Sequence, residues 1–156
     1  MDTEFFWAEV ELGIVVRKTC DRVELSEARS CIQGFVVCSD LSCQNIYSRD
    51  HHLGFSKSRA CFCPTSNEIA FLNPSQWKTL RMTTEINGRV TQEGSTENML
   101  MDPAEAVSYL SRITQLEAGD LILTGTTPGW KNNGLKVGDR VRHTIDFVGD
   151  LEYEIV

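Results

Sequence analysis

The stretch FFWAEVELGIVVR, residues 5–17, carries the strongest structural signal in the chain. β-Branched and aromatic residues dominate it, which is typical of a long strand suited to burial. Glu9 and Glu11 interrupt the apolar pattern two positions apart, so in a strand both carboxylates project from one face. Like charges this close repel, and Glu is rarely buried without a partner. The pair therefore predicts either a cation between the carboxylates or a solvated face of an edge strand.

The elements that follow this strand are short. Ser26 is a suitable N-cap for a helix over residues 26–33, and Gly34 is suited to end it. A short apolar strand over 35–38 then delivers Asp40 at its end. The chain from 41 to 64 is polar and irregular, with one possible helix over 42–47.

The second half of the chain predicts further strands and one clear helix. Asn87-Gly88 is a strong type I′ hairpin signal, and Asp102-Pro103 is typical of a helix start. The predicted elements are a hairpin of strands 80–86 and 89–92, a helix from Asp102 toward Ile113, a strand over 121–123, and a closing hairpin of 141–148 and 151–156 about Gly149-Asp150. The fold class is therefore mixed α/β and β-dominated, with a few short helices.

Length and charge restrict the function classes. The chain has 156 residues and a formal net charge of -7, from 15 basic and 22 acidic residues. This length fits a single domain, residues 1–156, with its own core. An acidic protein lacks the basic face that nucleic acids and anionic membranes require. No apolar run approaches the ~20 residues of a membrane span.

Cysteine usage and the N-terminal residues indicate an intracellular location. None of the six cysteines forms a C-x-x-C pair, so we expect reduced thiols rather than a zinc site or a disulfide scaffold. The start of the chain lacks the charged and apolar regions of a secretory signal. We expect a cytoplasmic protein, or a mitochondrial one in a eukaryote.

Glu9, Glu11 and Asp40 form the best candidate site, because each lies in or just after an apolar strand. Hard oxygen ligands of this kind suit Mg²⁺, Mn²⁺ or Ca²⁺ rather than zinc. The alternative is that the glutamates lie on a solvated face and that Asp40 only caps a turn.

Four other features have weaker functional interpretations beside ordinary structural ones. Lys57 could fix a carboxylate or an enolate as a point charge, or be a surface lysine. The Gly125-Thr126 turn could hold an anion, or be a plain strand-to-loop turn. The loop pair His51-His52 could supply a base, and Cys61-x-Cys63 could be redox-active or simply two loop thiols.

Four segments, taken in order, extend the argument beyond single residues. They are EVELGIVV (residues 9–16), IQGFVVCSD (32–40), INGRVTQEGST (86–96) and LEAGDLILTGT (116–126). Together they resemble the fumarylacetoacetate hydrolase family over nearly the whole chain. The resemblance implies a mixed β-roll that assembles as a homodimer.

The resemblance also implies roles for particular residues. Glu9, Glu11 and Asp40 fall on the three carboxylate ligands for Mg²⁺, or for Mn²⁺ or Ca²⁺. Lys57, within FSKS, falls on the family's active-site lysine. Two positions fall on substrate-binding residues: Thr126, on a threonine that contacts the substrate carboxylate, and Gln44, on an arginine that grips substrate.

The implied function is a metal-dependent hydrolase that cleaves a C–C bond of a small 2-oxo acid such as an acylpyruvate, through a stabilised enolate. Oxaloacetate-type decarboxylation and dienoate isomerisation or hydration are alternatives within the family. Three departures favour a further alternative, a catalytically impaired paralogue that binds only metal or a partner subunit. Only eight residues, none of them His, precede Glu9, where the family carries a lid with a water-activating His and Glu. Gln44-Asn45 replaces an Arg-Asp pair, and Thr127 displaces the proline that usually follows Thr126.

Overall fold

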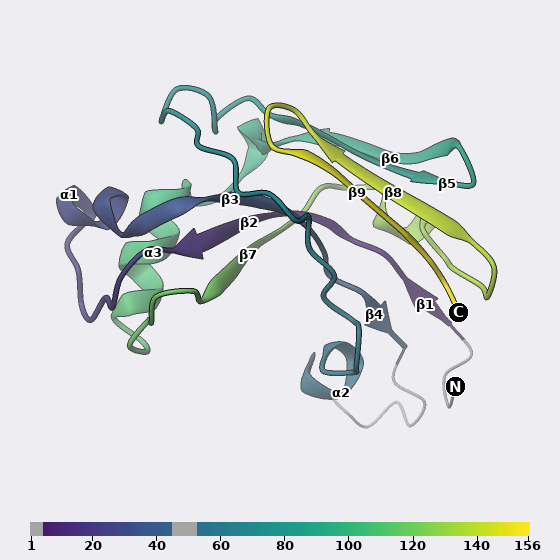
Figure 1. The fold of residues 1–156 in the computed structure, drawn as a ribbon, viewed down its shortest axis with the longest axis horizontal. Coiled ribbons are helices and arrows are strands. Elements are labelled where there is room, and N and C mark those ends of the chain that lie inside the picture. The colour runs from purple at the N-terminus through teal and green to yellow at the C-terminus, as the bar shows by residue number, and fades with distance from the viewer. Residues whose placement is uncertain (1–4, 45–52) are drawn as a thin grey trace.

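The computed structural model describes residues 5–44 and 53–156, and its strands form three antiparallel sheets (Figure 1). The first sheet has the order β3-β2-β7, with β2 in the centre. The second has the order β6-β5-β8-β9, and β1 pairs with β4 in the third. Their bounds are β1 Phe6–Trp7, β2 Val10–Val16, β3 Ile32–Ser39, β4 Ser42–Cys43, β5 Arg81–Ile86, β6 Arg89–Ser95, β7 Leu121–Thr126, β8 Arg140–Ile145 and β9 Gly149–Glu154.

The helices are short, as the sequence predicts, and the β-dominated fold class is confirmed. The longest helix, α3, has the predicted start: the Asp102 side chain accepts from the backbone N–H of Ala104 and Glu105, and Glu105 accepts from the Asp102 N–H. This capping box satisfies backbone donors that the first turn leaves free. The helical segments are α1 Leu25–Ala28, α2 Leu53–Lys57, α3 Pro103–Ser111 and the 3₁₀ turns η1 Arg29–Cys31, η2 Thr96–Asn98 and η3 Trp130–Asn132.

Strand β2 forms the centre of the main hydrophobic core. Val10, Leu12 and Ile14 are completely buried, and they pack with residues of β3, β7 and α3. Because β2 has a hydrogen-bonded neighbour on each side, the alternative of a solvated edge strand is wrong. Glu11 therefore lies within a central strand, where an unpartnered charge would be costly.

The long strand predicted over 5–17 is divided in two. The break falls at Ala8, whose backbone N–H donates to the Asn133 carbonyl and whose carbonyl accepts from the Asn133 side chain. These contacts replace the strand ladder at this point, so β1 and β2 belong to different sheets.

The helix predicted over 26–33 is also wrong in its bounds. It begins after Glu24 rather than at Ser26, and residues 32–34 belong to β3. Gly34 serves close approach rather than helix termination: a Cβ there would lie 2.6 Å from the Ala70 carbonyl oxygen. The next strand contact, from the Phe35 N–H to the same carbonyl, requires this approach.

The hairpins are confirmed with one shift in position. Asn87 and Gly88 both have positive φ, at 53° and 77°, as a type I′ turn requires. The closing hairpin turns at 146–148, so Gly149-Asp150 begins β9 instead of forming the turn. The helix predicted over 42–47 is wrong at 42–43, where β4 lies, and residues 45–47 are outside the described part of the chain.

All six cysteines are unpaired thiols, and Cys20, Cys31, Cys38 and Cys43 are buried. Across residues 5–44 and 53–156, no helix is long and apolar enough to cross a membrane.

A buried polar network joins the sheets. His143 on β8 is completely buried, with Nδ1 3.0 Å from the Thr84 hydroxyl and Nε2 2.9 Å from the Ser39 hydroxyl. Ser39 also lies 2.7 Å from the Tyr153 hydroxyl on β9. Burial lowers the pKa of His143 to about 3, so this ring stays neutral in the folded protein.

Buried His143 should make the free energy of unfolding decrease as the pH falls below about 6.5. In the unfolded chain a histidine takes up a proton below pH ~6.5, whereas folded His143 resists protonation until about pH 3. Stability is therefore fully present above 6.5 and is lost as the pH falls. Relative to His143→Gln, the wild type should lose up to about 1.4 kcal/mol of unfolding free energy per pH unit in this window. Urea unfolding at pH 7.5, 6 and 5 measures it, and a constant difference between the two proteins would contradict it.

Candidate functional site

The three predicted carboxylates meet at one place. Glu9, Glu11 and Asp40 each offer an oxygen within 4.8 Å of the others. The sheet register causes this: Glu11 pairs with Cys38, and the Asp40 N–H donates to the Glu9 carbonyl at 2.9 Å. Paired residues, and residues two apart on one strand, share a face, so all three side chains leave the same side of the β2–β3 pair.

Lys57 supplies a cation to this cluster. It is the last residue of α2, and its ammonium donates to Glu9 Oε2 at 3.0 Å, to Asp40 Oδ2, and to the Ser42 hydroxyl at 2.8 Å. Burial alone would lower the pKa of Lys57, but the hydrogen bonds to Asp40 and Glu9 outweigh it and raise the pKa. Lys57 therefore stays protonated and offsets the repulsion between the two carboxylates.

Glu11 is the most deeply buried of the three carboxylates. Desolvation is the largest cause that raises its pKa, which reaches about 7, and the charges of Asp40 and Glu9 add to it. The backbone N–H of Gly125, which donates to Glu11 Oε2 at 2.6 Å, opposes the rise. Glu11 therefore holds its proton to a much higher pH than an ordinary glutamate, and a further cation beside it would favour the ionised form.

The donor set fits a hard divalent ion. Three carboxylates with little solvent around them are the ligands that Mg²⁺, Mn²⁺ and Ca²⁺ take in proteins. The structure brings together Glu9, Glu11, Asp40 and Lys57, as the sequence predicts; their roles as ligands and catalytic group stay predictions.

Thr126 lies beside the cluster, paired with Glu11 across the β2–β7 ladder. Its hydroxyl donates to the Val10 carbonyl at 2.8 Å and accepts from the Gln92 side chain at 2.9 Å. A hydroxyl has one proton to donate. A substrate carboxylate at Thr126 would therefore have to replace the Val10 carbonyl as acceptor, and the substrate role of Thr126 stays a prediction.

The other predicted residues are less closely tied to the cluster. The Gln44 side chain is exposed, and its backbone N–H donates to the Phe5 carbonyl, so its contact with substrate stays a prediction. Asn45, His51 and His52 lie outside the described residues. Cys63 is exposed as a whole residue, but its thiol is partly desolvated. This desolvation, followed by the charges of Asp40 and Glu11, raises the pKa of the thiol and disfavours the thiolate that redox chemistry needs.

Sequence reasoning missed two side chains at the site. The Trp7 indole N–H donates to Glu9 Oε1 at 2.8 Å, and the spacing of two residues within the first strand was an available signal. Gln92 holds Thr126 and the Thr127 carbonyl, but it lies 34 residues before Thr126 and no local pattern reveals the pairing.

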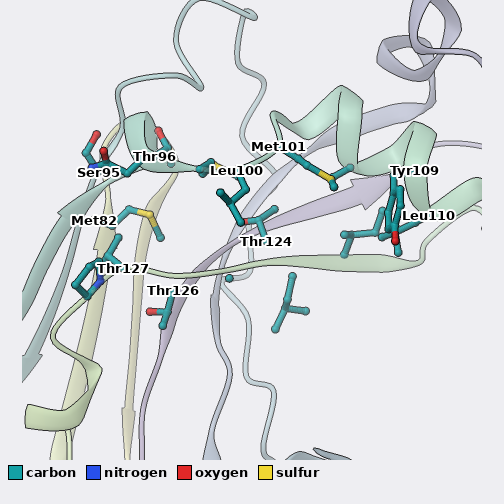
Figure 2. A pocket seen from close by; sticks show the side chains of 17 residues that line it. Met82, Ser95, Thr96, Leu100, Met101, Tyr109, Leu110, Thr124, Thr126 and Thr127 are labelled. Carbon is teal, nitrogen blue, oxygen red and sulfur yellow. The ribbon is translucent and has the colours of Figure 1, made fainter.

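An apolar pocket of about 460 Å³ is lined in part by residues of β7 (Figure 2). It is bounded by β7, by α3 and by the segment 95–101. Two of its lining residues also meet Glu11: the Gly125 N–H donates to this carboxylate, and Thr126 pairs with Glu11 in the ladder. Of the residues that line it, Leu100 is fully exposed and Met101 is about 41% exposed.

The fold and the site together define a class of protein: a β-roll with three carboxylates clustered where the central strand β2 begins and β3 ends. The chain belongs to the fumarylacetoacetate hydrolase family: residues 3–156 match the family described as fumarylacetoacetate (FAA) hydrolase C-terminal.

Relatives with known sequences support the same assignment. The chain is 34% identical over 144 residues to uncharacterized protein MJ1656 of Methanocaldococcus jannaschii, covering 92% of this chain and 59% of that protein. It is 30% identical over 151 residues to the mitochondrial oxaloacetate tautomerase FAHD1 of Mus musculus, covering 94% and 67%. The chain thus spans about 60% of the length of the first of these relatives and two thirds of the second.

Solved structures share the fold. The 5-carboxymethyl-2-hydroxymuconate delta-isomerase of Mycobacterium smegmatis superposes with a TM-score of 0.91 at 31% identity, over 99% of this chain and 60% of that one. A fumarylpyruvate hydrolase of Pseudomonas aeruginosa, crystallised with Mn²⁺ and pyruvate, gives a TM-score of 0.89 at 24% identity, over 99% of this chain and 67% of that one.

Replacement of Glu11 should remove a destabilisation of the folded protein that grows as the pH rises. Between pH 4.5 and about 7 the unfolded chain releases this proton while the folded chain retains it, so wild-type stability falls as pH rises. In the presence of EDTA, Glu11→Gln should therefore gain stability relative to wild type between pH 5 and 7, by up to about 1.4 kcal/mol per pH unit. Chemical unfolding of both proteins measures it, with the exposed Glu27→Gln as the matched control; equal pH profiles for all three would contradict it.

Proposed function

We propose that this chain is a divalent-metal-dependent enzyme that acts on a small 2-oxo acid through an enolate. One observation carries the proposal: Glu9, Glu11 and Asp40 converge within 4.8 Å, with the Lys57 ammonium hydrogen-bonded to two of them. One ammonium does not balance three carboxylates, and this uncompensated negative charge favours a cation site over a purely structural role.

The three carboxylates would hold Mg²⁺, with Mn²⁺ or Ca²⁺ as the other hard ions that suit them. When bound, such an ion supplies a Lewis acid at the keto and carboxylate oxygens of a 2-oxo acid. Glu11 must lose its proton to serve as a ligand, and the neighbouring Gly125 N–H stabilises the ionised form.

Lys57 would act at the substrate oxygen on which negative charge develops. Its raised pKa keeps the ammonium protonated. Its three N–H donors are held by Glu9, Asp40 and Ser42, so Lys57 would have to release one of these partners to donate to the enolate oxygen as the charge forms. The Ser42 hydroxyl, 2.8 Å from Nζ, holds the ammonium at the site on a neutral partner.

The first reaction that we propose is hydrolysis of the C–C bond of an acylpyruvate, which gives pyruvate and a carboxylic acid. An enolate of pyruvate is the leaving group of that cleavage. A divalent ion held by the three carboxylates, together with the Lys57 ammonium, would stabilise this enolate. The family also includes enzymes whose reactions share the enolate without the cleavage.

Keto–enol tautomerisation of oxaloacetate is the second candidate. Relatives from Mus musculus and Bacillus subtilis, at 30% and 29% identity, are named oxaloacetate tautomerases. This reaction moves one proton at the carbon next to the keto group and needs no attacking water. Decarboxylation of oxaloacetate, dienoate isomerisation or hydration, and a role limited to binding metal or a partner subunit, are the remaining outcomes to separate. We also propose a homodimer, with a cytoplasmic or mitochondrial location.

Turnover of two substrates separates these reactions. With Mg²⁺, loss of the enol absorbance of acetylpyruvate accompanied by pyruvate and acetate indicates hydrolysis; CO₂ from oxaloacetate indicates decarboxylation. Faster keto–enol equilibration of oxaloacetate without CO₂ indicates tautomerisation. We expect Lys57→Met to lower kcat by about 10²–10³-fold, because it removes a donor to the developing charge.

The exposed Lys78→Met is the matched control and should keep wild-type kcat. A folded protein that binds Mg²⁺ but turns over neither substrate would exclude the first two reactions and decarboxylation. It would leave dienoate isomerisation or hydration, or a role limited to binding. Full activity in Lys57→Met would exclude Lys57 from the chemistry.

A further inference from the structure

Both oxygens of the Glu9 carboxylate accept a hydrogen bond, one from a neutral donor and the other from a positively charged donor. The Trp7 indole N–H donates to Oε1 at 2.8 Å, and the Lys57 ammonium donates to Oε2 at 3.0 Å. Lys57 also donates to Asp40, so Oε2 is the Glu9 oxygen that faces the rest of the cluster. Oε1 is turned toward the indole.

We propose that Trp7 is a positioning residue for the metal site: its indole N–H fixes the Glu9 carboxylate so that Oε2 faces Glu11 and Asp40. The inference rests on the proposed function, in which Glu9 is a metal ligand. Donors that orient ligating carboxylates in this way typically determine metal affinity by factors of 10–100.

A neutral donor is suited to this task. A second ammonium at Oε1 would stabilise ionised Glu9 but would repel a divalent cation. The indole has one N–H and no acceptor, and it carries no net charge, so it orders the carboxylate without reducing the negative potential of the cluster.

The position of the Trp7 ring is itself fixed from several sides. In the β1–β4 pair Trp7 lies opposite Ser42, the residue whose hydroxyl holds Lys57. The indole stacks on Trp130 with centroids 5.2 Å apart and planes inclined by 27°, and the Phe5 ring lies 5.5 Å away on a tilted plane. A ring held in this way keeps its N–H directed at Glu9 without paying the ordering entropy each time an ion binds.

Two substitutions separate the effect of the Trp7 hydrogen bond on metal affinity from the effect of the aromatic stack. Trp7→Phe removes the N–H and keeps an aromatic ring against Trp130. Trp130→Phe alters the same stack but leaves the hydrogen bond to Glu9, and therefore serves as the matched control. The readout is Mn²⁺ affinity, measured from free Mn²⁺ by electron paramagnetic resonance, with circular dichroism to verify folding of each variant.

We expect Trp7→Phe to bind Mn²⁺ 10–100-fold more weakly than wild type, and Trp130→Phe to stay within about threefold of wild type. Unchanged affinity in Trp7→Phe, or an equal loss in both variants, would overturn the positioning role while leaving the metal site intact. Absence of Mn²⁺ binding by the wild type, with the same result for Glu11→Gln, would overturn the metal site itself and the inference with it.

A second measurement on the wild-type protein does not depend on the folding of Trp7→Phe. In ¹⁵N-labelled protein titrated with diamagnetic Mg²⁺, the Trp7 indole signal should shift, because its acceptor is a ligand. The Trp77 indole signal should not move, since Trp77 lies in the core against Phe35. Assignment uses the spectra of Trp77→Phe and Trp130→Phe, and an unmoved Trp7 signal at saturating Mg²⁺ would contradict the proposal.

Discussion

Repulsion between three carboxylates is the constraint on which the rest of this structure depends. Glu9, Glu11 and Asp40 bring carboxylate oxygens within 4.8 Å of one another where β2 begins and β3 ends, and little solvent reaches them to screen the charges. A loop would relax and separate such charges, whereas a strand pair with fixed register cannot. The Lys57 ammonium and a raised pKa of Glu11 reduce the repulsion, and both responses keep the cluster ready for a stronger cation.

The surrounding roll supplies the rigidity that this cluster needs. Ser39, which precedes Asp40, is tied through His143 to the second sheet, and Thr126, which faces Glu11, is tied through Gln92 to the same sheet. Thr84 joins the two ties, because its hydroxyl bonds both His143 and Gln92. Polar groups buried this fully stabilise one arrangement and penalise others, so the network fixes the spacing of the strands that carry the ligands.

The sequence predicts those features of the fold and the site that depend on residues close together in the chain, and not those that depend on residues far apart in the chain. The spacing of Glu9 and Glu11, the Asn87-Gly88 turn and the Asp102 cap are local patterns, and the structure confirms what they indicate about geometry. The division of the first strand at Ala8 could not be predicted, because Asn133 causes it from 125 residues away. The sequence predicts a helix end at Gly34, whereas the structure needs a glycine there for the close approach of the Ala70 carbonyl. Gln92 was missed for the same reason, since its partners are set by tertiary packing.

The shift in register between β2 and β7 has a consequence for how this chain tolerates insertions and deletions. Between the pairs Glu11–Thr126 and Gly13–Leu123, β7 carries one residue more than β2, and Gly125 takes a φ of 90° there. That extra residue turns the Gly125 N–H onto Glu11. Deletion of one residue at this point would restore a regular ladder and improve local pairing, but it would remove this donor and change the face of β7 that Thr126 occupies. Sequences that drift toward a more regular sheet here would thus gain order in the strand and lose the donor that opposes the rise in the Glu11 pKa.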